Sequence, residues 1–279
     1  MKLIPIIADN FKLDGGACFG VVPKSLWSRY VEADENNMIK ITNRCLLVDT
    51  GSKVILIDTG LGRKQSQDFF DYFYLFGDDT LEKSLNKAGY TTNQITDVIL
   101  THLHFDHVGG AVKWAEDNNT PELVFKNATY YCSKAQYESA LNPNPREKAS
   151  YFRENFVPIF EAGKLKFIDS DCNFCPGVDI EIKNGHTNGQ IIVLIDYKGK
   201  KIAYMGDFIA AIQNIPLPYV PAYDVLPLVS MHEKEEFLNR AVNNDYILFF
   251  EHDFDNECCN LKQTPKGVRH NEILKIEGI

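Results

Sequence analysis

Hydrophobic residues along the chain form short apolar runs separated by turn residues. The runs at 38–48 and 53–58 predict two paired strands, because Asp49-Thr-Gly-Ser52 between them is a turn signal. Further apolar runs predict strands at 97–100, 165–169, 178–183, 190–197, 201–205 and 246–250, the last of them the final strand of the chain.

Apolar residues at helical spacing appear in three regions. Residues 80–88 carry leucines on one face and end at a glycine, and 133–161 reads as helix interrupted by two prolines. Residues 230–242 predict an amphipathic helix. Ser230 is its expected N-cap, with Glu233 three residues later completing a capping box.

The stretch from 208 to 228 contains four prolines and predicts a long irregular loop. The order of strands, helices, strands, a helix and a strand predicts a mixed α/β fold, with two packed sheets and helices outside in four layers. No Gly/Ser linker divides the chain. We therefore expect a single domain over 1–279, with an N-terminal arm of about residues 1–35.

Composition and charge exclude several classes of partner. The 279 residues are 44% apolar, which suits a globular protein, and the net charge of −9 disfavours nucleic acid and anionic membranes. No run approaches about 18 apolar residues, so we expect no membrane span. The first residues lack a signal peptide and the seven cysteines are irregularly spaced, which favours a reduced cytoplasmic protein. A homodimer is one assembly that the sequence leaves open.

Three histidines and one aspartate fall within the six residues 102–107. Imidazole nitrogens and carboxylates suit zinc and other first-row divalent ions. If the segment begins as a strand end, His102 and His104 project to the same side because side chains alternate. The turn that follows would bring Asp106 and His107 round to a second position. Two glycines then let the backbone close tightly behind the ligands.

A cluster of four ligands needs distant partners, because each metal ion takes four or more. His186, Asp207 and His252 each lie just past a predicted strand, where loops usually build sites. The two remaining histidines need no such role. His232 lies in the first turn of a predicted helix and His270 in a charged tail.

Taken in order, these motifs resemble the metallo-β-lactamase superfamily. The matching segments are Asp58-Thr-Gly60, His102-x-His-x-Asp-His107, Gly185-His186, Gly206-Asp207 and His252. The resemblance covers roughly residues 35 to 255. It implies the four-layer αββα sandwich of that family, with the metals at one end between the sheets.

The resemblance also implies roles for the candidate ligands. Asp58 would support the metal loop, and the site would take two divalent ions, zinc first, with manganese, cobalt or iron as alternatives. The implied ligands are His102, His104 and His186 for one ion, Asp106, His107 and His252 for the other, and Asp207 as the bridge between them.

The bridging position separates the branches of the family. The true β-lactamases have Cys or Ser where this chain has Asp207, which argues against antibiotic hydrolysis. The spacing resembles the lactonase and organophosphate-hydrolase branch. The best-known lactonases carry a Tyr about one turn after the bridging Asp, whereas this chain has Phe208-Ile-Ala-Ala211 there. Tyr219 or Tyr223 on the proline-rich loop would have to substitute.

The expected function is hydrolysis of a small ester, lactone or phosphotriester by a metal-bridging hydroxide. Asp106 would be the catalytic carboxylate, orienting the hydroxide and passing its proton to the leaving group. Aromatic walls suit such a small-molecule substrate. The candidate wall residues are Phe19, Trp27, Tyr219 and Tyr223, on segments expected to be irregular and near the metal end.

Two other readings stay open at this stage. The first is an iron-dependent oxidoreductase of the same fold, similar to a sulfur dioxygenase. Metal analysis and oxygen consumption would separate it from a hydrolase. The second is a structural zinc on Cys172-Asn-Phe-Cys175, whose spacing fits a zinc ribbon. No second pair complements it, so ordinary thiols are the preferred interpretation.

Overall fold

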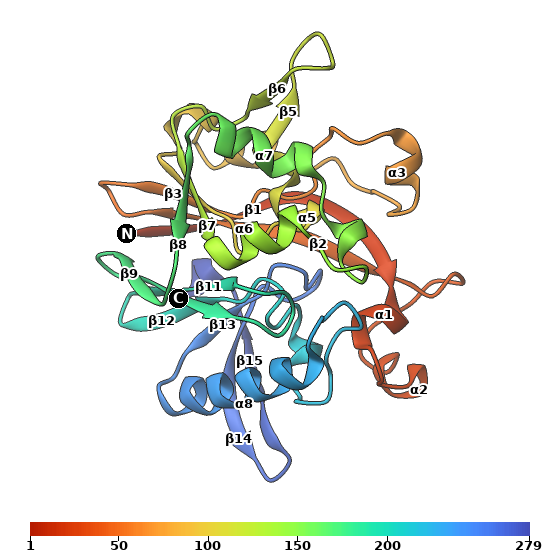
Figure 1. The fold of residues 1–279 in the computed structure, drawn as a ribbon. Helices are drawn as coiled ribbons and strands as arrows, with labels where there is room; N and C mark the ends of the chain where they lie inside the picture. The colour runs from red at the N-terminus through yellow and green to blue at the C-terminus, as the bar shows by residue number, and fades with distance from the viewer. The chain divides into compact units, whose positions relative to one another are not determined.

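The computed structural model describes residues 1–279, which divide into two compact units (Figure 1). The first unit comprises Met1–Asn10 and Thr42–Ser170, and the second comprises Phe11–Ile41 and Asp171–Ile279. Each unit has its own hydrophobic core. Whether they form the single domain expected from the sequence stays a prediction.

The sheet of the first unit has the strand order β1-β2-β3-β4-β7-β8. The last four strands run parallel, so their carboxyl ends meet at one edge, and residues that follow β3 and β4 come together there. The strands are β1 (Lys2–Asp14), β2 (Met38–Asp49), β3 (Val54–Ile57), β4 (Asp97–Ile99), β7 (Thr129–Ser133) and β8 (Leu165–Ile168), with β5 (Val112–Trp114) and β6 (Pro121–Leu123) in a separate ribbon.

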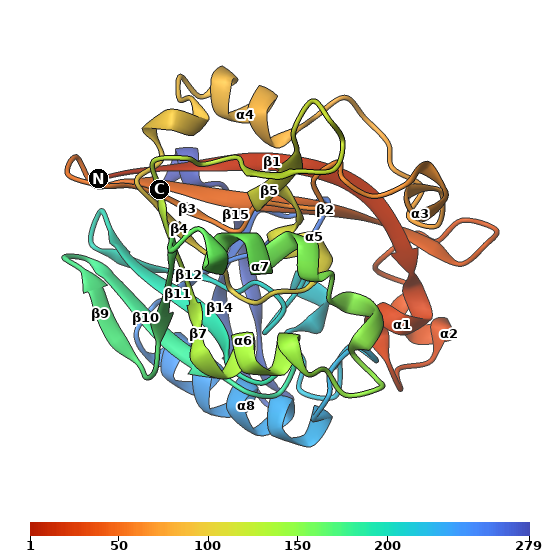
Figure 2. The ribbon, with the colours of Figure 1, turned by 45° about the horizontal axis from the view of Figure 1, so that its top comes forward.

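Helix α4 (Leu81–Lys87) covers this sheet beside β1 (Figure 2). Its apolar face is buried in the core, as the leucine spacing predicts, and Ser84 Oγ donates to the carbonyl of Ile7 at 2.6 Å. The other helices of this unit are α3 (Gln67–Asp71), α5 (Phe105–Val108), α6 (Lys134–Leu141) and α7 (Arg153–Glu161), with short 3-10 turns η1 (Thr92–Gln94), η2 (Gly109–Ala111) and η3 (Lys148–Ser150).

The sheet of the second unit has the strand order β15-β14-β13-β12-β11-β10-β9. Strand β11 is antiparallel to both its neighbours and β13 is parallel to β12, so β10, β12 and β13 run in one direction. Their carboxyl ends therefore share one edge. The strands are β9 (Cys172–Cys175), β10 (Val178–Lys183), β11 (Gln190–Tyr197), β12 (Lys200–Tyr204), β13 (Ile247–Phe249), β14 (Cys258–Thr264) and β15 (Gly267–Leu274).

Helix α8 (Pro227–Asn243) crosses β14 and β15 (Figure 1) and buries Phe237 and Leu238 in the core of the second unit. Two short helices, α1 (Gly15–Phe19) and α2 (Lys24–Trp27), and the 3-10 turns η4 (Ile212–Asn214) and η5 (Ile276–Gly278) complete this unit. No helix of the chain is both long and apolar enough to cross a membrane.

The predicted start of α8 is wrong. The helix begins at Pro227, which suits the first helical position because a proline lacks the N–H that would be unpaired there. Ser230 therefore lies inside the helix, and its hydroxyl donates to Asp224 instead of capping. Glu233 accepts from the backbone N–H of Asn184 at 3.0 Å, so it anchors the segment after β10.

Other elements also differ from the sequence prediction. Strand β1 contains Pro5, a residue that usually argues against a strand, but β1 lies at the sheet edge where a missing N–H is tolerated. The hairpin of β14 and β15 follows the strand predicted to be the last. Phe19 and Trp27 lie in α1 and α2, not in irregular segments.

Candidate metal centre

The loop after β4 carries the histidine cluster. His102 and His104 are buried, and the Nε2 of His102 lies 3.0 Å from the Nδ1 of His104. Two imidazole nitrogens turned toward each other at this distance offer two ligands to one ion. The alternation expected of an extended segment thus brings these two side chains together.

Asp106 and His107 form a second pair on the short helix α5 that follows. The Oδ2 of Asp106 lies 3.8 Å from the Nε2 of His107, and both side chains are largely buried. The ring of His107 also lies against that of His102, with the centroids 3.9 Å apart, so the two pairs are neighbours. The loop therefore gathers all four candidate ligands, and their division between two metal positions stays a prediction.

Asp58 orients this loop from the neighbouring strand. It follows β3, which lies beside β4. The carboxylate of Asp58 accepts two hydrogen bonds from Thr101, one from its N–H at 2.7 Å and one from its hydroxyl at 2.6 Å. The same carboxylate faces the Nδ1 of His107 at 3.1 Å. A histidine held in this way presents its Nε2 as the ligand atom. The support role implied for Asp58 matches these contacts.

Glycines are required where the loop after β3 passes the metal loop. The carbonyl of His107 accepts from both the N–H and the hydroxyl of Thr59, each at 2.8 Å. A Cβ on Gly109 would lie 2.0 Å from the carbonyl oxygen of Leu61, and one on Gly110 would lie 2.1 Å from that of Thr59. Since real Cβ atoms do not approach so closely, the two glycines allow the tight closure predicted from the sequence.

Glu147 is a partner of His104 that the sequence does not reveal. Its Oε2 lies 3.7 Å from the Nε2 of His104, the nitrogen opposite the one that faces His102. Tyr151 donates to the same carboxylate at 2.9 Å, and Gln136 donates to Tyr151 at 2.7 Å. All three partners are buried. These residues lie on α6 and in the turns after it, far along the chain from His104. No local sequence motif therefore marks them.

In the second unit, Asp207 lies between two histidines. Its Oδ2 is 3.2 Å from the Nε2 of His186, and its Oδ1 is 2.8 Å from the Nε2 of His252. These residues follow β10, β12 and β13, whose carboxyl ends share an edge. The three partners predicted one by one from strand ends are thus brought together.

Further buried groups hold this trio. Asp224 faces the Nδ1 of His186 at 2.9 Å, which leaves Nε2 directed at Asp207. With its amide turned so that the oxygen faces the loop, Gln190 accepts from the N–H groups of Asp207 and Phe208 at 2.9 Å. Asp224 and Gln190 contact residues of other loops, so their spacing in the sequence does not predict these supporting contacts.

Aromatic side chains surround Phe105, which lies in the sequence between the pair His102 and His104 and the pair Asp106 and His107. Phe105 packs against Phe73 with ring centroids 5.1 Å apart, Phe69 at 5.4 Å and Phe152 at 5.8 Å. Each of these rings is only half-buried. This apolar group includes Phe105 of the metal loop itself, and no pattern in the sequence marks it as a substrate wall.

The aromatic residues that the sequence did select form a cluster of their own. Phe19 stacks on Trp27 at 5.2 Å and meets Tyr219 edge-on at 6.4 Å. Phe19 and Trp27 are 2% and 1% exposed, whereas Tyr223 is 40% exposed. The first two are therefore buried in this structure, and the substrate-binding role of the cluster stays a prediction.

The model of the metallo-beta-lactamase superfamily matches residues 42–252, which is most of the chain and includes every candidate ligand. The chain belongs to the metallo-beta-lactamase superfamily. Its sequence is 25% identical over 234 residues to an N-acyl homoserine lactonase of Bacillus cereus, covering 79% of this chain and 85% of that protein.

Solved structures of this superfamily have the same fold. A probable metal-dependent hydrolase from Staphylococcus aureus is similar over 98% of both chains, with a TM-score of 0.87 and 28% identity. A dizinc quorum-quenching lactonase in complex with a product covers 98% of this chain and 95% of its own, with a TM-score of 0.76 and 24% identity. The predicted fold class is confirmed, and the chain is a metal-dependent hydrolase.

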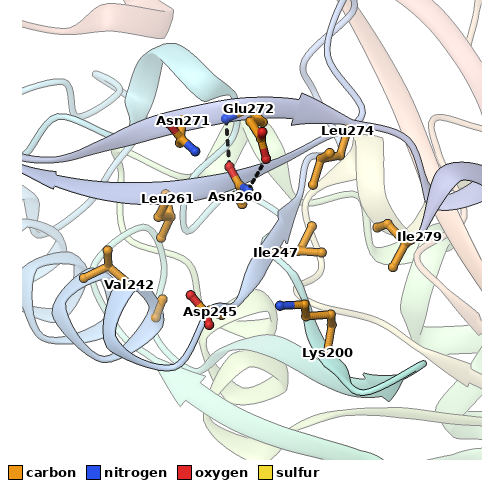
Figure 3. Close-up of a pocket in the computed structure, with 11 residues that line it drawn as sticks. Lys200, Val242, Asp245, Ile247, Asn260, Leu261, Asn271, Glu272, Leu274 and Ile279 are labelled. Atoms are coloured by element: carbon orange, nitrogen blue, oxygen red, sulfur yellow. Dashed lines mark hydrogen bonds between the residues drawn. The ribbon is translucent and has the colours of Figure 1, made fainter.

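The second unit has a cavity that is lined by none of the candidate metal ligands of this chain. It has a volume of about 420 Å³ and lies between the end of α8 and the β14–β15 hairpin (Figure 3). Asn260 and Glu272 on its wall are hydrogen-bonded to each other at 2.7 Å. No candidate metal ligand lines it, so it is not part of the metal centre.

Asp9 predicts a dependence of stability on pH. It accepts from the N–H of Leu61 at 2.8 Å and pairs with Arg63, but burial raises its pKa from 3.8 to about 6. Between these values the folded chain binds more protons than the unfolded chain. The free energy of unfolding therefore falls as pH rises from about 4 to 6, by about 2–3 kcal/mol.

Chemical unfolding of the metal-free protein across this pH range tests the prediction. Asp9→Asn is expected to lack this part of the slope, because an amide does not titrate. The exposed Asp78→Asn variant serves as the matched control and should keep it. Identical slopes in all three proteins would show that Asp9 is not the group responsible.

Proposed function

We propose that this chain is a dinuclear metal-dependent hydrolase of small esters, lactones or phosphotriesters. The observation that carries the proposal is the position of Asp207, whose two oxygens face the imidazoles of His186 and His252. A carboxylate so placed can contribute one oxygen to each of two ions. Two-metal sites of this kind hold their ions about 3.5–4 Å apart.

The ligands would divide into two sets, one for each ion. His102, His104 and His186 would hold one ion, Asp106, His107 and His252 would hold the other, and Asp207 would bridge them. The orientation of the imidazoles supports this assignment. Three of the five histidines hold their second ring nitrogen within 3.1 Å of a neighbouring side-chain oxygen, which is how metal-binding histidines are usually held.

The donor set fits zinc, with manganese, cobalt or iron as alternatives, because it consists of imidazoles and carboxylates. Bound divalent ions would supply hydroxide at neutral pH and polarise the substrate oxygen. Asp106 is the carboxylate we assign to catalysis. Its position beside His107 supports this role, in which it would orient the hydroxide and carry its proton to the leaving group.

The half-buried rings around Phe105 support a substrate with an apolar substituent, because such a group removes further ring surface from water. Relatives from Bacillus are named N-acyl homoserine lactonases, which agrees with a lactone bearing an apolar chain. The net charge of −9 disfavours strongly anionic substrates.

The direct test is a panel of lactones, aryl esters and phosphotriesters. Chelator-treated protein would be reloaded with Zn, Mn, Co or Fe and assayed on each substrate. We expect hydrolysis in at least one class, with KM falling as the apolar chain lengthens. Oxygen consumption with iron, and no hydrolysis with any metal, would reject the proposal in favour of an oxidoreductase.

A further inference from the structure

Helix α8 carries a lysine whose charged end is buried. Lys234 is 3% exposed, and its Nζ donates to three backbone carbonyls, those of Asn214 at 2.9 Å, Pro216 at 3.1 Å and Tyr219 at 3.2 Å. An ammonium group has three N–H donors, and here each has an acceptor. The three carbonyls belong to the proline-rich loop between β12 and α8.

The same loop is tied to α1. The side-chain amide of Asn214 donates to the carbonyls of Cys18 and Tyr219, both at 3.3 Å. Further along, the N–H of Ala222 donates to the carbonyl of Ala17 at 2.8 Å. The loop and α1 are therefore held together, and the amine of Lys234 lies where three carbonyls of the loop converge.

The loop and α1 together position the aromatic cluster of Phe19, Trp27 and Tyr219. Phe19 at the end of α1 contacts both Trp27 and Tyr219, the second of which lies on the loop. The approach is close, because a Cβ on Gly20 would lie 2.3 Å from the carbonyl oxygen of Val220. If the loop moved away from α8, Phe19 would lose its contact with Tyr219, and the stack of Phe19 on Trp27 would lose that support.

We propose that Lys234 is a positioning residue for substrate binding, which fixes the loop carbonyls and through them the contact between Tyr219 and Phe19. Lys234 does not touch the substrate. The inference rests on the proposed function and on the sequence-based prediction that the cluster of Phe19, Trp27 and Tyr219 belongs to the substrate pocket. It predicts that substrate affinity, more than turnover, depends on a residue of α8.

Kinetics of Lys234→Met in the metal-loaded protein test this role. Methionine keeps the buried stem but removes the three hydrogen bonds that Nζ donates to the loop carbonyls. We expect KM to rise about tenfold while kcat and metal content stay within about twofold of wild type. Lys234→Arg keeps the charge and should recover part of the affinity. Lys201→Met is the matched control. It removes the ion pairs of Lys201 on β12 with Asp179 and Asp196, away from the loop, and should leave KM unchanged.

A second readout does not need activity. The chain has two tryptophans, so Trp114→Phe leaves Trp27 as the reporter, and acrylamide quenching measures its accessibility. Quenching of Trp27 should increase in Lys234→Met and also in Asn214→Ala, which removes a different link to α1.

The outcomes separate the inference from the proposed function. Unchanged quenching in both variants, or a loss of kcat with KM unchanged, would overturn the role of Lys234. If the wild-type chain hydrolyses nothing in the panel, the proposed function fails. The quenching result still decides whether Lys234 holds the loop.

Discussion

Replacing Asp207 by alanine is expected to remove at least one of two metal ions and to lower kcat/KM by about a thousandfold. The reason is that its two oxygens face His186 and His252 separately, so alanine removes the carboxylate that lies between them. A loss of several kcal/mol of transition-state stabilisation corresponds to this change in rate. Metal content per chain and kcat/KM on the best substrate are the measurements.

Asp196→Ala is the control for this variant, because Asp196 is an exposed aspartate of β11 whose loss leaves the metal centre intact. Asp207→Asn should resemble the alanine variant, since a neutral amide is a poor bridge between two cations. If Asp207→Ala keeps two ions per chain and full activity, Asp207 is not the bridge.

Replacing Asp58 by alanine is expected to weaken metal binding about 10–100-fold. Asp58 touches no substrate in this account. It accepts two hydrogen bonds from Thr101 and faces His107, so its removal frees the metal loop and the imidazole together. Competition with a chromophoric chelator measures the affinity, and activity at saturating metal should recover most of its wild-type value.

Asp49→Ala is the matched control, because Asp49 ends β2 and is paired with Tyr90 at 2.7 Å but does not contact the metal loop. It should bind metal as the wild type does. Equal metal affinity in Asp58→Ala and Asp49→Ala would contradict the orienting role of Asp58.

Much of the fold was predictable because most elements are locally consistent. The apolar run at 38–48 became β2, and the leucine spacing near residue 81 became α4. The failures have specific causes. Pro5 hides β1, and the polar residues of β14 and β15 resemble a tail because this hairpin forms the exposed edge of its sheet. The start of α8 was misplaced because a capping-box pattern also occurs by chance inside a helix.

The candidate ligands were predictable for a different reason. The hexapeptide from His102 to His107 concentrates its donors locally, and the other candidates stand at strand ends that topology brings to one edge. Glu147 and Asp224 were missed because each supports a histidine across a long loop closure. Only the folded chain shows that these carboxylates are buried and aimed at ring nitrogens.

Family membership does not extend to the substrate. The stretch after Asp207 places Phe208 where the lactonase branch is expected to have its Tyr, and Phe208 is buried in the core of the second unit. Tyr223 is the more exposed of the two candidate replacements that were named. Its hydroxyl is hydrogen-bonded to the thiol of Cys18, and burial is the main cause that raises the pKa of that thiol to about 12.

Titration of metal-free protein with zinc, followed by activity and by bound metal, tests the central claim most directly. The account predicts that hydrolysis reaches its maximum at two ions per chain, and that Asp207→Ala never reaches it. Full hydrolytic activity at one ion per chain, with no further change on adding a second, would contradict a dinuclear centre bridged by Asp207.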